Sequence, residues 1–159
     1  MADVRLSLAA FDPESELATF RQAHRQSGGV VSFCGQVRAG DEVTALELSH
    51  YELLTLPAMQ QLATDTQHRW SLDGLLLIHR AGVMLPGEPI VLVAAAARHR
   101  RDAFAAADFA MDHLKAESWF WKREQRGGVW QWIEHGRRII LIWQGGRLIA
   151  ATSRAVLPL

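Results

Sequence analysis

The sequence has no excess of charge of either sign. Its 159 residues include 17 lysines and arginines against 17 aspartates and glutamates, so the formal net charge is zero. Proteins that bind nucleic acid carry a basic field over much of their surface, and this composition excludes one. A site for an anion must therefore be built locally, and we expect no nucleic-acid partner.

Cysteine is nearly absent as well. Cys34 is the only one, which excludes an internal disulfide and, without a Cys-x-x-Cys pair, the usual zinc and thioredoxin-like patterns. No apolar run approaches the roughly 18 residues that a membrane span needs. Asp3 comes before any apolar run, and no basic segment leads into a signal-type core. We expect a cytoplasmic protein with no membrane association.

Several catalytic patterns are also missing. The seven histidines include no His-Glu-x-x-His or His-x-x-x-His pair, and His50 with Glu52 lacks the Pro-Cys-x-x-Cys half of a zinc deaminase. Neither glycine-rich phosphate loop, G-x-x-x-x-G-K or G-x-G-x-x-G, occurs. We therefore expect no metal site and no nucleotide cofactor.

The length suits a single domain, residues 1–159, with a proper core. Alternation and apolar runs predict strands over residues 4–9, 30–37, 43–51, 75–82, 90–97 and 129–133, and a hairpin from 138–143 and 148–152. Capping signals predict three main helices, starting at Asp12, at Thr55 and after His99. This order indicates an α+β domain with a mostly antiparallel sheet.

Two strands carry more specific expectations. Residues 30–37 are predicted to form a central strand, paired with 43–51 through a tight turn, with Gly35 where a neighbour approaches closely. Residues 90–97 are all apolar, which predicts burial on both faces. Cys34 is interpreted as a small core residue, although a nucleophile with a histidine partner stays open.

The third helix carries an apolar stripe at helical spacing, made of Ala103, Phe104, Ala107, Met111 and Leu114. Lys115 follows at the edge of the stripe. Lys122 comes seven residues later, after an aromatic cluster at 119–121, and would lie within about 20° of the same face if the helix continued. An apolar patch of this kind desolvates an ammonium group, and desolvation lowers a lysine pKa. The alternative is a packed helix whose solvated basic end suits its dipole.

Other cations lie at the ends of predicted elements. Arg38 closes a strand, and His99 and Arg100 stand at the start of a helix, where backbone amides favour anions. The sequence does not decide whether these cations converge with the two lysines. Taken singly, Arg38 also suits a turn and His99 a helix cap.

Four segments in order resemble the large, catalytic subunit of molybdopterin synthase. They are Phe-Cys-Gly-Gln-Val-Arg at 33–38, Ile-His-Arg-Ala-Gly with Leu-Pro-Gly-Glu at 78–88, His-Arg-Arg-Asp-Ala-Phe at 99–104, and Met-Asp-His-Leu-Lys with Phe-Trp-Lys-Arg-Glu at 111–124. The resemblance spans roughly Val30 to Trp132. It includes both lysines with their separation of seven residues.

The resemblance implies roles for individual residues. Lys115 and Lys122 would be catalytic, while Arg38, His99 and Arg100 would hold the anionic pterin substrate. The pocket would also be lined by Phe33 and Met111. No cofactor is implied, because molybdenum is inserted into the product later by other proteins.

The resemblance also implies an α/β-hammerhead fold and an assembly. Two large subunits would form a homodimer within a heterotetramer, with a small ubiquitin-like sulfur-carrier subunit docked at each end. The carrier's C-terminal Gly-Gly thiocarboxylate would donate sulfur to cyclic pyranopterin monophosphate. Two anions meeting in one pocket require fixed cations to offset their repulsion, which suits the basic residues named above.

Two other functions remain open at this point. A family relative that retains the fold and partner groove without the chemistry would act as a carrier-binding module. A hydrolase using Cys34 would instead be sensitive to thiol reagents.

Overall fold

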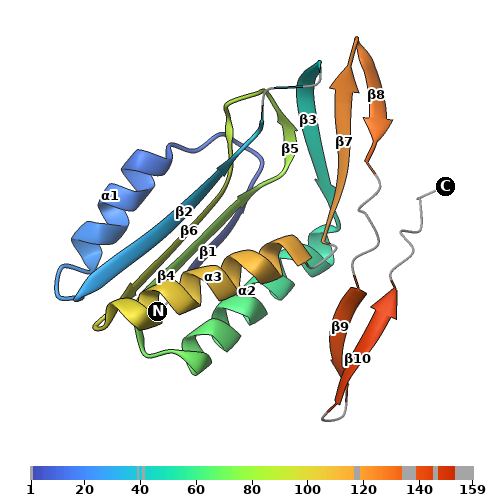
Figure 1. The fold of residues 1–159 in the computed structure, drawn as a ribbon. Coiled ribbons are helices and arrows are strands. Elements are labelled where there is room, and N and C mark those ends of the chain that lie inside the picture. The colour runs from blue at the N-terminus through green and yellow to red at the C-terminus, as the bar shows by residue number, and fades with distance from the viewer. Residues whose placement is uncertain are drawn as a thin grey trace.

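The computed structural model describes residues 2–38, 40, 42–116, 119–133, 139–144 and 147–152. Along the chain, the elements are β1 (Ala2–Ser7), α1 (Pro13–Ala23), β2 (Gly29–Gln36), β3 (Val43–His50), α2 (Glu52–Arg69), β4 (Leu72–Arg80), β5 (Gly82–Met84), β6 (Pro89–Ala97), α3 (Arg100–Ala116), β7 (Phe120–Arg126), β8 (Val129–Trp132), β9 (Ile139–Gln144) and β10 (Arg147–Thr152). The α+β class predicted from the sequence is confirmed (Figure 1).

The strands form two four-stranded sheets and one hairpin. The first sheet has the order β1-β4-β6-β2, and the second has the order β5-β3-β7-β8. Only β1 and β4 pair in parallel among the described strands, so both sheets are mostly antiparallel, as expected. The hairpin pairs β9 with β10 and confirms the prediction for that part of the chain.

Helices cover both faces of the first sheet (Figure 1). Because side chains alternate along a strand, Leu75 and Leu77 of β4 pack towards α2 and α3, whereas Leu76 and Ile78 pack towards α1. On β6, residues 91–97 are all buried, which confirms the prediction of burial on both faces.

A smaller apolar cluster joins the two sheets. This junction cluster consists of Val37, Leu46, Leu48, Ala81, Met84 and Phe120, all at most 8% exposed. Its members come from β3, β5 and β7 and from the residues that directly follow β2 and β4. The junction cluster therefore fixes the position of the second sheet against the first, and with it the space between them.

The prediction for residues 30–51 is wrong in two respects. The strand β2 is an edge strand with exposed Ser32, Phe33 and Cys34, not a central one, and it pairs with β6 instead of β3. The strand β3 belongs to the second sheet, where it pairs with β5 and β7. The chain therefore passes from the first sheet to the second between Arg38 and β3.

The helix boundaries differ from those predicted at some points. Asp12 caps α1 as expected, its carboxylate accepting the Glu14 amide at 3.2 Å. Thr55 does not cap α2, because the helix already starts at Glu52. The buried Thr55 hydroxyl donates to the Tyr51 carbonyl oxygen at 3.0 Å and lies 3.3 Å from the Trp119 carbonyl oxygen. Phe104 is 61% exposed and therefore does not belong to the inward stripe of α3, whereas Ala103, Ala107, Met111 and Leu114 are buried as predicted.

The apolar run at 139–143 predicts that residues 138–159 pack against the rest of the molecule or a second copy, because it would otherwise be an exposed apolar edge. This prediction concerns side chains outside those described. Within the described part of the chain, no helix has the length and apolar character to cross a membrane.

Candidate functional site

A cavity of about 590 Å³ opens where the end of α3 meets the two sheets. We call it the lysine cavity. Its lining comes from the end of β2 and the residues after it, and from β3, β4, β6, α3 and β7: Gly35, Gln36, Val37, Arg38, Gly40, Val43, Leu46, His79, Ile90, Val91, Met111, Lys115, Lys122 and Glu124. Four residues predicted for the site, Arg38, Met111, Lys115 and Lys122, therefore meet in one place.

Lys115 is delivered by the last turn of α3. Met111, one turn earlier, is 8% exposed and packs in the core against the first sheet, which anchors this end of the helix. The Lys115 side chain is exposed, and its Nζ lies 5.4 Å from the centre of the Phe33 ring on β2. At this distance the face of the ring attracts the ammonium. Phe33 does not line the lysine cavity itself and is connected to it only by this contact with Lys115, so its expected place in the pocket stays a prediction.

Lys122 reaches the same cavity from a strand, not from a continued helix. α3 ends at Ala116, and Lys122 lies on β7 opposite Leu48 of β3. Residues two apart on a strand share a face, so Lys122 and Glu124 are neighbours, and Lys122 Nζ lies 2.7 Å from Glu124 Oε1. Lys122 is therefore paired with a carboxylate on its own strand, which the sequence did not predict.

Glu124 pairs with cations on both sides. Its second oxygen accepts from Arg126 at 2.8 Å, and its side chain is only 12% exposed. The hydrogen bond from Lys122, assisted by the Arg126 charge, lowers the pKa of Glu124 below its ordinary value. Glu124 is thus a fixed anion that orients Lys122. On the opposite face of β7, Arg123 pairs with Glu47 and lies over the rings of Trp130 and Trp132.

Arg38 is placed by its neighbour Val37. The Val37 amide donates to the Glu88 carbonyl at 2.9 Å, and the Val37 carbonyl accepts the Gly87 amide at 2.8 Å. Gly87 has a φ of 88°, which a residue with a side chain rarely adopts, so this turn depends on glycine. The two backbone bonds hold the chain beside the cavity while the Arg38 side chain remains exposed.

His79 lies deepest of the titratable residues that line the cavity. Its side chain is 7% exposed, and its ring stacks on Phe120 at 4.0 Å between centroids. Burial lowers the pKa of His79 from 6.5 to about 4, partly offset by the hydrogen bond to the Arg80 carbonyl. The ring is therefore neutral near pH 7.

His99 and Arg100 do not meet the other predicted residues. Both are exposed at the start of α3, and neither lines the lysine cavity. With a rise of about 1.5 Å per residue, the helix separates Arg100 from Lys115 by about 22 Å. Their expected part in substrate binding stays a prediction, and within one copy of the chain they are remote from the lysines.

The cavity is electrostatically asymmetric. Its charged lining consists of the cations Arg38, Lys115 and Lys122 and the single carboxylate of Glu124, which Arg126 shares. Three cations around a partly enclosed space favour ligands with several negative charges. In the described part of the chain, no group of three or more histidine, cysteine or acidic side chains is placed to hold a metal ion.

Cys34 is exposed on β2, and its interpretation as a core residue is wrong. Burial of part of the thiol and the charge of Glu14 raise its pKa, which disfavours the thiolate. The one hydrogen bond described for its Sγ is a weak one to the Gly35 carbonyl at 4.0 Å. These surroundings do not support a cysteine nucleophile.

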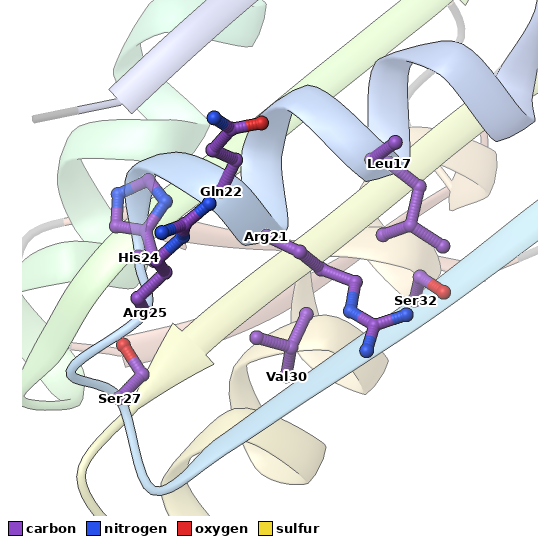
Figure 2. A pocket seen from close by; sticks show the side chains of 9 residues that line it. Leu17, Arg21, Gln22, His24, Arg25, Ser27, Val30 and Ser32 are labelled. Atoms are coloured by element: carbon purple, nitrogen blue, oxygen red, sulfur yellow. The ribbon is translucent and has the colours of Figure 1, made fainter.

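A second hollow, of about 730 Å³, lies between α1 and β2. Figure 2 shows that Arg21 extends towards Ser32 while Arg25 extends back towards His24, so that the two guanidinium groups diverge. None of the predicted site residues lines this hollow. We therefore assign the chemistry to the lysine cavity, although its volume is smaller.

Two titratable residues of the lysine cavity received no role from the sequence, His79 and Glu124. A signal existed for each. His79 directly follows the apolar run at 75–78, and a polar side chain in a buried strand costs free energy unless it has a hydrogen-bond partner or a function. Glu124 stands two positions from Lys122, which matters only once this segment is known to be a strand.

The fold and the cavity define a class of protein: an α+β domain that gathers cations around one space for an anionic ligand. The chain belongs to the MoaE protein family, because the sequence model of that family matches residues 6–117. It is 44% identical over 136 residues to a molybdopterin synthase catalytic subunit from Mesorhizobium japonicum, covering 82% of this chain and 84% of the relative.

Two further comparisons agree. A molybdopterin synthase catalytic subunit from Ralstonia nicotianae is 42% identical over 137 residues, covering 84% of this chain and 78% of the relative. The solved structure of molybdopterin cofactor biosynthesis protein E from Burkholderia multivorans superposes with a TM-score of 0.72 at 38% identity, covering 84% of this chain and 88% of that one.

Proposed function

We propose that this chain is the catalytic subunit of a molybdopterin synthase. In this role it transfers sulfur from the C-terminal thiocarboxylate of a small ubiquitin-like carrier subunit to cyclic pyranopterin monophosphate, which becomes the dithiolene of molybdopterin. The names of relatives more than 40% identical support the role, and a catalytic subunit works with a second subunit.

The observation that carries the proposal is the meeting of Arg38, Lys115 and Lys122 around one cavity. The substrate carries a phosphate, and the sulfur donor is itself an anion. Bringing two anions together is unfavourable unless fixed cations offset their repulsion, and cations already in place require no reorganisation during the reaction. Three elements of the fold supply these cations independently.

The net reaction exchanges sulfur for oxygen. In each transfer, the thiocarboxylate of one carrier becomes a carboxylate, and one carbon–oxygen bond of the substrate is replaced by a carbon–sulfur bond, without net oxidation. Two transfers, from two carriers, supply the two sulfur atoms of the dithiolene. Lys115, at the end of an ordered helix, suits proton transfer or a transient bond to a carbonyl-type carbon. Lys122, held by Glu124, suits electrostatic stabilisation of the developing negative charge.

The direct test combines the protein with its thiocarboxylated carrier and cyclic pyranopterin monophosphate. Formation of a dithiolene product, detected by mass spectrometry, supports the proposal. Carrier binding without product would instead indicate a non-catalytic carrier-binding module. Substituting carrier with an ordinary C-terminal carboxylate is the matched control, because it docks but has no sulfur to give.

A further inference from the structure

His79 is buried where the two sheets meet, and the function proposed above gives it no role. It is the penultimate residue of β4, between Leu6 of β1 and Val91 of β6. One face of its ring is covered by Phe120, the rings being inclined by only 15°. Despite this enclosure, His79 is part of the lining of the lysine cavity.

The hydrogen bonding of His79 defines the state of its ring. Nδ1 lies 3.0 Å from the Arg80 carbonyl oxygen. A carbonyl oxygen only accepts, so Nδ1 carries the proton. In the neutral ring, Nε2 then has a lone pair and no hydrogen, and acts only as an acceptor.

Nε2 is free to receive a donor from the cavity. No hydrogen bond to it exists among the described residues, and it is not one of the fully buried side-chain nitrogens without a partner, which in this part of the chain are His50 Nδ1 and Arg80 Nε. The cavity's cations offer only donors, and the carboxylate of Glu124 is already engaged by Lys122 and Arg126. Besides the Gln36 amide, His79 Nε2 is therefore an uncommitted side-chain acceptor in a lining whose charged groups are mostly cations.

We propose that His79 Nε2 accepts a hydrogen bond from a ring N–H of the pterin substrate and so helps the cavity to select it. This inference rests on the proposed function. A fused pterin ring carries several N–H groups, and a buried N–H without an acceptor is costly. The phosphate would face the cations, and the flat ring would extend towards His79 and the apolar residues beside it.

Two substitutions separate the acceptor from the structural contact. In His79→Asn, the amide nitrogen replaces Nδ1 and keeps a donor for the Arg80 carbonyl, but nothing reaches the position of Nε2. In His79→Gln, the longer side chain can present its oxygen there. We expect His79→Asn to raise the KM for cyclic pyranopterin monophosphate about tenfold, with kcat and carrier affinity unchanged. His79→Gln should restore most of the loss.

A histidine-selective ¹⁵N NMR titration tests the same contact in the unmodified protein. Adding cyclic pyranopterin monophosphate without carrier should shift the Nε2 resonance of His79 and leave Nδ1 in its protonated position. An unmoved Nε2 resonance at saturating substrate would overturn the inference, even if His79→Asn failed to fold.

The kinetic outcomes are equally decisive. An unchanged KM in His79→Asn, or an equal increase in both variants, would overturn the inference, the second result making His79 a structural residue. A loss of carrier affinity at unchanged substrate KM would assign Nε2 to the carrier's tail instead. If the unsubstituted protein forms no product, the proposed function fails first; if it does and the variants match it, only the role of His79 fails.

Discussion

At the scale of single residues, the two lysines differ in how they are held. Lys115 stands on a helix anchored by Met111 in the core, with its ammonium near the Phe33 ring. Lys122 stands on a strand and is tied to Glu124. A group that exchanges a proton or forms a covalent bond must be rigidly placed without being locked into an ion pair, which favours Lys115 for chemistry.

We expect Lys115→Ala to abolish product formation while thiocarboxylated carrier still binds. Lys115→Arg should fail too, because guanidinium keeps the charge but does not readily lose a proton or form an imine. Lys122→Ala should reduce turnover severely but less completely. Single-turnover assays with preformed carrier complex measure each effect. Near-normal turnover by Lys115→Arg would make Lys115 an electrostatic anchor and pass the chemical role to Lys122.

Glu124 should act by orienting Lys122. We expect Glu124→Gln to lower kcat about tenfold or more, because an amide holds an ammonium far less firmly than a carboxylate does. Stability should fall by about 1 kcal/mol or less, since Lys122 and Arg126 are each 35% exposed. Glu47→Gln is the matched control, because it breaks an ion pair on the opposite face of β7. Equal kcat values for the two variants would contradict this role.

His79 should make the fold sensitive to acid. Its pKa is 6.5 when unfolded and about 4 when folded, so between these values the unfolded chain binds more protons. Stability should therefore fall as the pH drops from 6.5 to 4, by at most about 3 kcal/mol from this residue. Denaturant unfolding across this range should show a flatter profile for His79→Gln. The exposed His68, changed to Gln, should leave the profile as it was.

At the scale of elements, the sequence predicts what local patterns control. The Asp12 cap, the fully buried run of β6 and the terminal hairpin were all predictable because each depends on neighbouring residues. The partner of β2 was not, because strand pairing is a long-range choice and a short turn favours the hairpin interpretation. Likewise, no local signal distinguishes a helix continuing to Lys122 from a strand that returns to β3.

The same reasoning applies to the site. The motifs predicted that Arg38, Met111, Lys115 and Lys122 belong together, and the structure brings them to one cavity. Phe104 fits the helical spacing but is exposed. The spacing identifies the face of the helix that packs inward, but it does not show how far around the helix the contact extends. The neutral ring of His79 depends on the Phe120 stack and on burial, which only the fold creates.

Gly35 lies where β2 packs very closely against the strand beside it. A Cβ placed there would lie 2.7 Å from Val91 Cγ1 and 3.4 Å from the Phe33 ring. We expect Gly35→Ala to cost about 1–3 kcal/mol of stability through overpacking. In a double-mutant cycle with Val91→Ala, monitored by chemical denaturation, the two losses should be less than additive. Strict additivity would show that Val91 gives way without strain.

At the scale of the whole molecule, β2 has an exposed edge that can pair with another strand. The apolar strand β6 does not need a second copy for its burial, because helices cover both its faces and β4 and β2 occupy both its edges. The remaining liability is β2, whose exposed Ser32, Phe33 and Cys34 include no lysine or proline to discourage pairing.

We therefore still expect a homodimer, built partly from sheet edges, within a heterotetramer with two carriers. Light scattering at micromolar concentration should give the mass of a dimer for this chain alone. Cys34→Lys on the exposed edge should weaken the dimer, and Thr19→Lys on the exposed surface of α1 is a matched added charge. A monomer at that concentration would contradict the expectation.

The junction cluster determines how the site responds to heating. Lys115 stands on a helix packed against the first sheet, and Lys122 belongs to the second sheet. The distance between the two lysines therefore depends on how the two sheets are joined, not on either sheet alone. Proteins open in parts before they unfold as a whole. A partial opening at Leu46, Met84 and Phe120 would part the two lysines while every helix and strand kept its hydrogen bonds. On heating, we therefore expect activity to be lost when the two sheets separate, at a lower temperature than that at which the secondary structure unfolds.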